Sequence, residues 1–251
     1  MPDAFLSSRF KVERAEKHIQ DLYSLLVGFG EAYPHTVTVE MDSEGFNWLG
    51  VNVSFSTFPN AQAAMIVGDA LHNLRSSLDI LWNEVIELCG GTPTRWSRFP
   101  IRDTADDLKA PLNAALENGQ IDDTVYALVL NTIKPYKTGN TLLWALDDLN
   151  IRDKHQLLIP MLRLAWISGV CLKDDKEEII KLPVMHADGS WRVHIGLRGR
   201  KLTVQDKGKI SPSVFFRDGF PYERDSVSLA LLGIAEEVTR TIETLAVSFP
   251  D

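Results

Sequence analysis

Residues 60–89, NAQAAMIVGDALHNLRSSLDILWNEVIELC, decide the fold expected for this chain. Apolar side chains recur every three or four residues along this stretch, which predicts one long amphipathic helix. Asn60 is the expected N-cap, and a Gly-Gly pair directly after Cys89 predicts the end of the helix. The apolar stripe consists of Val67, Leu71, Leu74, Leu78, Leu81 and Val85.

The opposite side of this helix carries an unusual set of polar side chains. From residue 61 to 83 there is neither Lys nor Glu, and most polar groups are held close to the backbone. Solvated helix surfaces favour long Lys, Glu and Arg, because Asp, Asn and Ser are poorer helix formers. We therefore expect this side to be at least partly covered, so that its polar groups pair with each other, with another helix or with a ligand. They are Asp69, His72, Asn73, Ser76, Asp79 and Asn83.

Segments on either side of this helix predict an α+β fold for residues 1–251, treated as one domain. Alternating residues between 36 and 55 predict a β-hairpin within a helical part that spans 1–156. Short apolar runs separated by turns predict an antiparallel sheet over 157–217. The expected architecture is thus a helix-bundle core with an N-terminal hairpin and a C-terminal sheet, closed by a last helix. Besides 60–89, the expected helices span residues 8–27, 104–117, 122–133, 141–155 and 225–248.

The composition is that of a folded protein and excludes several function classes. The chain has 251 residues, 45% of them hydrophobic, and a net charge of −8, which argues against a surface that binds nucleic acid or anionic lipid as a whole. Cys89 and Cys171 cannot build a zinc site alone, and we expect no cofactor. The first residues lack the apolar stretch of a signal peptide, and the longest apolar run is too short to span a membrane. A cytoplasmic protein is therefore expected.

The helix expected at 141–155 carries a carboxylate where its apolar stripe should continue. Asp153 occupies that position, and a carboxylate in a core stripe is costly unless it is hydrogen-bonded or ion-paired. Arg75 or His72 of the long helix is the expected partner. Asp148 and Arg152 lie four residues apart, which favours an ion pair within the helix. The apolar part of the stripe is Leu142, Leu146 and Leu149.

These two helices predict either a structural polar network or a site. A buried salt bridge between helices that fixes their packing is the structural alternative. The functional alternative is a cleft with the groups needed for acid–base chemistry, and its catalytic candidates are Asp69, His72, Arg75, Asp153 and His155. The candidates for ligand binding are Asp69, His72, Asn73, Arg75, Ser76, Asp153 and His155.

Two further groups of residues have a possible chemical role. His18, His72 and His155 lie on three expected helices and could converge on a metal ion, although no two of them have metal-like local spacing. Residues 192–209 hold six basic residues against one acidic residue. Exposed hairpins are commonly basic for solubility, and the alternative is contact with phosphate groups of a nucleic acid. That contact would use Arg192, Arg198, Arg200 and Lys201.

The string G-D-A-L-H-N-L-R-S-S-L-D at 68–79, with Asp153-Lys154-His155 later, resembles a family of uncharacterised bacterial and phage-associated proteins. That family has a G-D-x-x-H-N-L-R-S-x-L-D helix, and the resemblance implies no activity. The chain is also weakly similar to HEPN-type ribonucleases, whose motif places a His a few residues after an Arg. At R-x-x-x-x-H spacing from Arg75, Ile80 stands where that His would be.

Three functions are consistent with these observations. The first is a cytosolic binding or accessory protein whose polar helix face receives a small ligand or a partner. The second is a hydrolytic enzyme, metal-dependent or acting on RNA, with His72 as general acid and base. The third is a structural protein, such as a homo-oligomer or a part of a phage-related assembly, with a buried polar network and no ligand.

Overall fold

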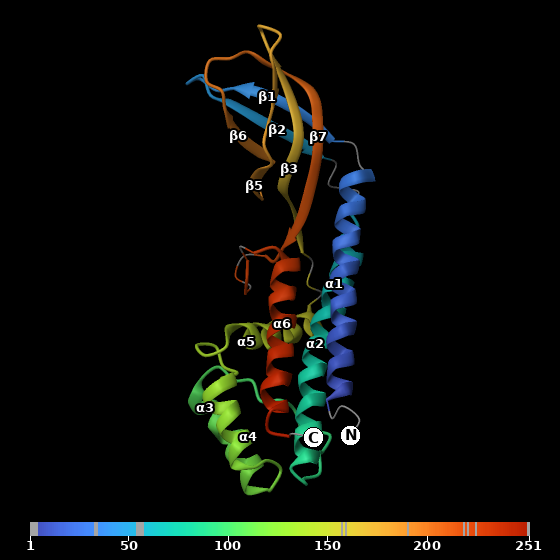
Figure 1. Ribbon diagram of the computed structural model, residues 1–251, viewed down its shortest axis with the longest axis vertical. Coiled ribbons are helices and arrows are strands. Elements are labelled where there is room, and N and C mark those ends of the chain that lie inside the picture. Colours follow the sequence, from blue (N-terminus) through green and yellow to red (C-terminus); the bar gives the residue numbers. More distant parts are fainter. Residues whose placement is uncertain are drawn as a thin grey trace.

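Three long helices run side by side through the lower part of the molecule in the computed structural model, and the strands lie at its other end (Figure 1). They are α1 (Leu6–Ala32), α2 (Asn60–Leu88) and α6 (Val227–Ala246). The α+β architecture is confirmed. The structure describes residues 5–32, 35–53, 58–156, 158, 160–189, 191–217, 219, 221–223 and 225–249.

The apolar stripes of these helices form the core between them. Every stripe residue expected on α2 is buried, and α1 and α6 bury residues at the same spacing of three and four. Fully burying one Leu or Ile contributes about 1.5–3 kcal/mol, so the packed stripes, rather than helix propensity, stabilise this bundle. Asn60 does not cap α2: Pro59 occupies the N-cap position, and no side chain caps the helix there. The predicted end at Cys89 is confirmed.

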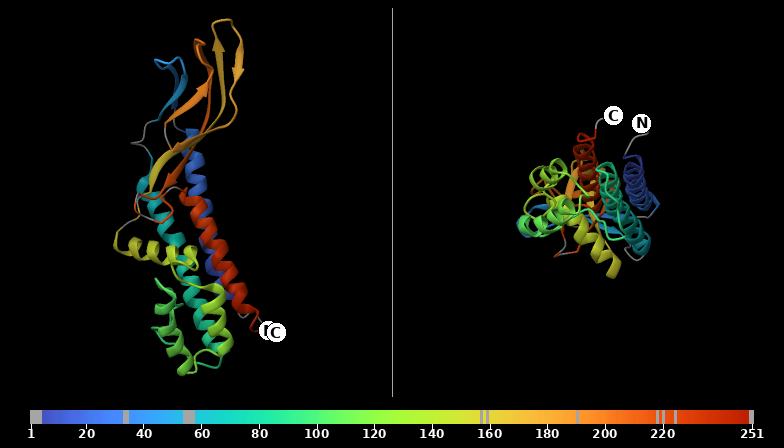
Figure 2. Two further views of the ribbon diagram at one scale, coloured as in Figure 1. Left: turned by 90° about the vertical axis from the view of Figure 1, so that its left-hand side faces the viewer. Right: turned by 90° about the horizontal axis from the view of Figure 1, so that it is seen from below.

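Shorter helices pack against one side of the bundle. The helix predicted over 122–133 is α-helical only in its first part and then widens into a π-helix. Thr104, Asp122 and Asn140 cap the helices that follow them with side-chain oxygens. The helix that Asn140 caps lies across α2 and α6 (Figure 2). The elements are α3 (Ala105–Glu117), α4 (Asp123–Ala127), η2 (Leu128–Ile133) and α5 (Thr141–His155).

The strands form two antiparallel sheets rather than a hairpin and one separate sheet. In the first, the order is β1-β2-β6, so a strand from the C-terminal half joins the N-terminal hairpin. In the second, β3 pairs with β4 and β5 and also with β7, along most of its length. Residues 54–55 of the predicted hairpin lie outside the described residues. The strands are β1 (His35–Met41), β2 (Asn47–Val53), β3 (Met161–Asp174), β4 (Ile179–Lys181), β5 (Met185–Gly189), β6 (Arg192–Gly196) and β7 (Leu202–Phe215).

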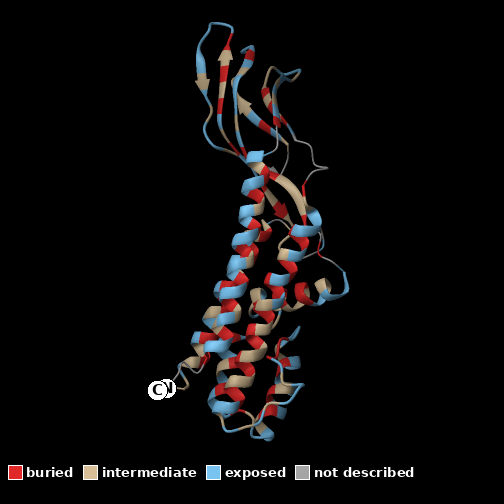
Figure 3. Cartoon of the chain, turned by 90° about the vertical axis from the view of Figure 1, so that its right-hand side faces the viewer, coloured by how far each residue is buried: buried red, intermediate tan, exposed pale blue. Residues whose placement is uncertain are grey.

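Buried residues follow the helices and continue into the sheets (Figure 3). The start of α1 lies close to the end of α6, as the distance of 6.1 Å between the ring centroids of Phe5 and Phe249 shows. Within the described ranges, the helices are too short or too polar to cross a membrane.

Candidate functional site

The polar side of α2 is open along its first half and covered along its second half. Asp69 and His72 are exposed, whereas Asp79 is half-buried and Arg75 is only 8% exposed. The expected partial cover is therefore confirmed, and Arg75 is its centre.

Arg75 joins three separate segments of the chain. Its Nε donates to Asp147 Oδ1 on α5 at 2.7 Å, its Nη1 to Asp79 Oδ1 at 2.5 Å, and its Nη2 to the Phe99 carbonyl at 3.1 Å. Asp79 Oδ1 also accepts the Phe99 backbone N–H at 3.1 Å. The Arg75–Asp79 pair therefore binds both backbone polar groups of Phe99 through charge-assisted hydrogen bonds.

These bonds fix the loop of residues 94–102 against the bundle. The buried Phe99 ring meets the Trp82 ring edge-on, with centroids 5.8 Å apart and an interplanar angle of 89°. At the end of the loop, the Arg102 N–H donates to the Pro135 carbonyl at 3.0 Å. The loop is thus held at two points and forms a fixed wall beside α2.

A cleft of about 740 Å³ lies between this loop, α2, α3 and α5. Its volume is within the range of pockets that bind small molecules, about 300–1,000 Å³. The residues that line it and carry polar or aromatic groups include His72, Arg75, Ser76, Asp79, Trp82, Trp96, Arg98, Phe99, Arg102, Asp147, Asn150 and Lys154.

The cleft carries an excess of positive charge. Arg75 is balanced by Asp79 and Asp147, the two carboxylates of the lining. In the part of the chain that the structure describes, Arg98 and Lys154 have no hydrogen-bond or ion-pair partner, and both are exposed. The cations beyond Arg75 are Arg98, Arg102 and Lys154.

An aromatic ring and an amide add to this lining. Trp96 is 71% exposed, and the Arg95 guanidinium lies 4.7 Å from its ring centroid. Asn150 is only 4% exposed, yet its side chain makes no hydrogen bond to any described residue. The amide atoms of Asn150 are not among the described buried polar atoms that lack a partner, so they reach solvent and are available to a ligand in the cleft.

Asp153 does not pair with Arg75 or His72, so that prediction is wrong. Its Oδ1 accepts the Leu158 N–H at 3.3 Å, just beyond the end of α5. Its Oδ2 lies against Gly68 of α2, where an added Cβ would come within 2.5 Å of it. The position of Asp153 in the apolar stripe therefore predicts correctly that it faces α2, but the residue predicted as its partner is wrong. Arg75 pairs instead with Asp147, on the same helix as Asp153.

The structure brings only some of the predicted residues to the cleft. His72, Arg75 and Ser76 line it, while Asp69, Asn73, Asp153 and His155 do not. The Asn73 Oδ1 instead accepts from Lys11 Nζ at 3.3 Å, which links α2 to α1, while its Nδ2 donates to the Asp69 carbonyl of its own helix at 2.8 Å. The predicted ion pair between Asp148 and Arg152 is confirmed at 2.7 Å.

His72 has little support as an acid–base group. Its Nε2 lies 3.5 Å from Ser76 Oγ, a long contact, and no described carboxylate hydrogen-bonds its ring. His18, His72 and His155 also do not converge: across the described ranges no group of three or more His, Cys, Asp or Glu residues could hold a metal ion. The described residues thus give no support to a metal site at these three histidines.

The basic stretch at 192–209 is largely occupied by contacts within the sheets. Arg192 pairs with Glu40 at 3.0 Å and lies 5.2 Å from the Trp48 ring centroid. Arg198 Nε donates to the Glu44 carbonyl at 3.0 Å. These contacts tie β6 and the turn after it to the N-terminal hairpin. These contacts also reduce the positive charge that is available to a nucleic acid. The predicted binding of nucleic-acid phosphates by this stretch stays a prediction.

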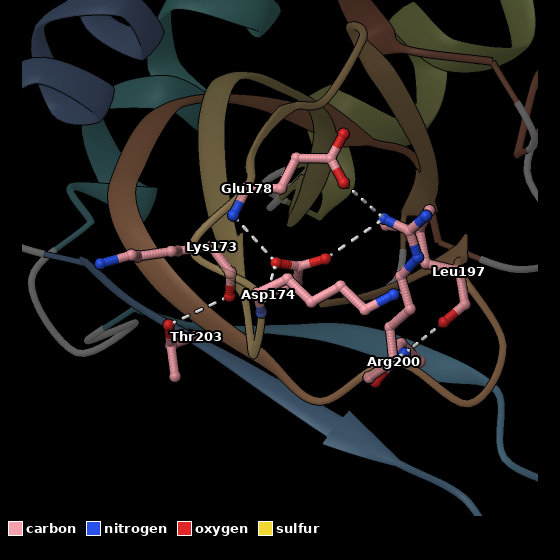
Figure 4. Close-up of polar contacts among 8 residues, drawn as sticks. Lys173, Asp174, Glu178, Leu197, Arg200 and Thr203 are labelled. Atoms are coloured by element: carbon pink, nitrogen blue, oxygen red, sulfur yellow. Dashed lines mark hydrogen bonds and ion pairs between the residues drawn. The ribbon is translucent and has the colours of Figure 1, made fainter.

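Arg200 is engaged in the same way on the second sheet (Figure 4). Its Nη1 lies 3.5 Å from Asp174 Oδ2 and 3.4 Å from Glu178 Oε2. Asp174 Oδ1 accepts the backbone N–H groups of Lys176 and Glu178, both at 2.9 Å. The hydrogen bond from the Glu178 N–H, more than the charge of Arg200, holds the pKa of Asp174 below its usual range. Lys201 is exposed and has no partner among the described residues.

Sequence reasoning missed most of the cleft. The residues from α5 lie on one helical face at 147, 150, 151 and 154, and this spacing could have identified them. The aromatic and cationic residues of the 94–102 loop could not be identified in this way, because the side chains of an irregular loop do not repeat at a regular spacing. The missed residues are Trp96, Arg98, Phe99, Arg102, Asp147, Asn150 and Lys154.

A comparison of the chain with protein family models, curated proteins and solved structures finds no match. The resemblances of residues 68–79 therefore stay predictions, and the function has to be inferred from the geometry of the cleft.

Proposed function

We propose that this protein binds a small anionic ligand in the cleft beside the 94–102 loop. The observation that carries the proposal is the charge of the lining. Its two carboxylates are committed to Arg75, whereas Arg98 and Lys154 have no described partner. In a chain with a net charge of −8, this is a local positive region that an anion would enter in preference to a cation.

The remaining lining supports a ligand that also has a planar or hydrogen-bonding part. The exposed Trp96 ring offers a stacking surface, and Arg98 can bind a carboxylate or phosphate through two parallel hydrogen bonds. The Asn150 amide offers a donor and an acceptor that no described group uses. The ligand class we favour is a phosphate or carboxylate attached to a planar ring.

The other two functions have weaker support. A hydrolase would need His72 to be held by a hydrogen-bonding partner, and its described contact is the long one to Ser76. A purely structural role explains Arg75, whose donors are engaged on three sides. It does not explain why Arg98, Lys154 and Asn150 surround an open cleft without partners.

The test is calorimetric titration of the protein with three probes: AMP, inorganic phosphate and adenosine. We expect AMP to bind more tightly than phosphate and adenosine to bind least, since charge supplies most of the attraction. Arg98→Ala and Lys154→Ala should each weaken AMP binding about tenfold, the equivalent of one charge-assisted hydrogen bond at about 1.5 kcal/mol. Lys17→Ala, which changes an exposed lysine of α1 outside the cleft, is the matched control.

Two results would contradict the proposal. Binding of AMP that Arg98→Ala and Lys154→Ala leave unchanged would place the ligand elsewhere. Adenosine binding as tightly as AMP would show that charge is not the basis of recognition. The hydrolase alternative is tested separately, because RNA cleavage that survives His72→Ala excludes His72 as its catalytic group.

A further inference from the structure

A second and larger hollow lies on another part of the molecule, where α1 and α6 approach the second sheet. It has a volume of about 1350 Å³ and runs along β7 between the last turns of α1 and the first turns of α6. We call it the β7 groove. It shares no lining residue with the cleft beside the 94–102 loop.

The walls of the β7 groove expose large apolar side chains. Leu229 is 67% exposed and Leu232 is 44% exposed on α6, and Tyr23 and Val27 of α1 are 57% and 39% exposed. Trp166 of β3 is 47% exposed. Apolar side chains gathered around one hollow, rather than scattered singly, indicate a surface that binds an apolar group.

Two lysines of β7 lie near Trp166, because Trp166 pairs in register with Ser211 and Ser168 with Lys209. Lys207 and Lys209 line the groove, and Lys207 Nζ donates to the His35 carbonyl at 3.4 Å. Lys209, which pairs in register with Ser168 of β3, has no hydrogen-bond or ion-pair partner among the described residues. Neither lysine has a described carboxylate partner, and Lys209 differs from Lys207 in that all of its N–H donors are available to a ligand.

The length of the groove follows from the strand that forms it. From Lys209 to Phe215 there are six residue steps in β7, or roughly 20 Å at about 3.3 Å per residue. One leaflet of a bilayer core is about 15 Å thick, which is the reach of an extended acyl chain. A long-chain acyl group with its head at Lys209 would thus end near α6.

We propose that the β7 groove binds a long-chain fatty carboxylate. The carboxylate head pairs with Lys209, and the acyl tail lies between the apolar residues of α1 and α6. Glu31 and Asp225 also line the groove. Glu31 is in the last turn of α1, close in sequence to the His35 end, so it opposes the binding of an anion there.

The test is a titration with saturated carboxylates of 8, 10, 12 and 14 carbons below their micellar concentrations. Affinity should rise by up to about fourfold for each added methylene, the equivalent of about 0.8 kcal/mol per buried CH₂. It should stop rising when the chain fills the groove. The alcohol of 12 carbons should bind more weakly than the carboxylate, and Lys209→Met should remove that difference.

One matched pair of variants and one further variant distinguish the groove from other apolar surfaces. Leu229→Asp should weaken binding of the 12-carbon carboxylate at least tenfold, whereas Val247→Asp, which changes an 81% exposed residue at the end of α6, should leave it unchanged. Glu31→Gln should strengthen binding. All of these positions are exposed, so the variants should fold, as thermal unfolding can verify.

Affinity that does not depend on chain length, or that falls equally in both Asp variants, would overturn the proposal. So would a concentration-dependent dimer that Leu229→Asp dissociates, because the groove would then be covered by a second copy of the chain. The outcome is independent of the cleft, since neither Arg98 nor Lys154 lines the groove.

Discussion

Replacement of Arg75 by Met tests whether this residue holds the 94–102 loop. Met keeps much of the apolar stem and removes the guanidinium. The variant leaves Asp79 and Asp147 without their shared cation and the Phe99 carbonyl without its donor. It also removes one of the two bonds that fix the Phe99 backbone to α2, so the wall of the cleft should loosen.

The expected loss of stability follows from the burial of the network. Removing one partner of a fully buried ion pair costs about 3–5 kcal/mol. The Arg75 side chain is 10% exposed, but those of Asp79 and Asp147 are 31% and 26% exposed, so water screens part of the effect. We therefore expect a loss of about 2–3 kcal/mol, or roughly 5–10 °C in Tm for a domain of this size.

Thermal unfolding followed by circular dichroism measures this loss, and a double variant identifies its cause. Arg75→Met/Asp147→Asn should be more stable than Arg75→Met, because it removes a carboxylate that has lost its partner. Lys109→Met, which breaks an exposed pair with Asp106, should leave Tm nearly unchanged, because water screens that pair. A loss below about 1 kcal/mol in Arg75→Met, or a double variant less stable than the single one, would refute the reasoning.

Three further changes have expected outcomes. Gly68→Ala should lower the free energy of unfolding by about 1–2 kcal/mol in urea, although Ala favours helices, because its Cβ would lie 2.5 Å from Asp153 Oδ2. A stabilised variant would contradict that contact. Asn140→Ala should cost about 2–3 kcal/mol in the same assay, since it removes the cap of α5 and a hydrogen bond to a buried α6 carboxylate. The lowered pKa of Asp174 stabilises the fold above its usual titration range, and this contribution is lost as the pH falls through the folded-state pKa. Asp174→Asn should therefore flatten the acid-side fall in stability, and a fall as steep as that of the parent protein would exclude Asp174 as its source.

The helices of the bundle could be predicted because their signal is local. A spacing of three and four places α1, α2 and α6 correctly, and each stripe is buried as expected. The π-helical turn of η2 could not be foreseen, because the same apolar pattern fits an ordinary α-helix.

The partners of the strands and of the charged residues could not be predicted. Alternation identifies β6 as a strand, but its pairing with β2 depends on contacts across more than a hundred residues of sequence. The sequence names Arg75 as a partner for Asp153, but Arg75 pairs with Asp147 instead. Which carboxylate it would meet depended on how α5 crosses the bundle. Asp147 rather than Asp153 faces Arg75, and only the three-dimensional packing decides between them.

The contact between Phe5 and Phe249 determines how the molecule would respond to force. A pull applied at these two residues acts across the seam between α1 and α6, so the helices would peel apart one turn after another instead of shearing along their length. The sheets at the far end would bear tension only after the seam has opened. In an optical trap, the first extension should therefore occur at low force and match the separation of two helices, with the sheets resisting to higher force.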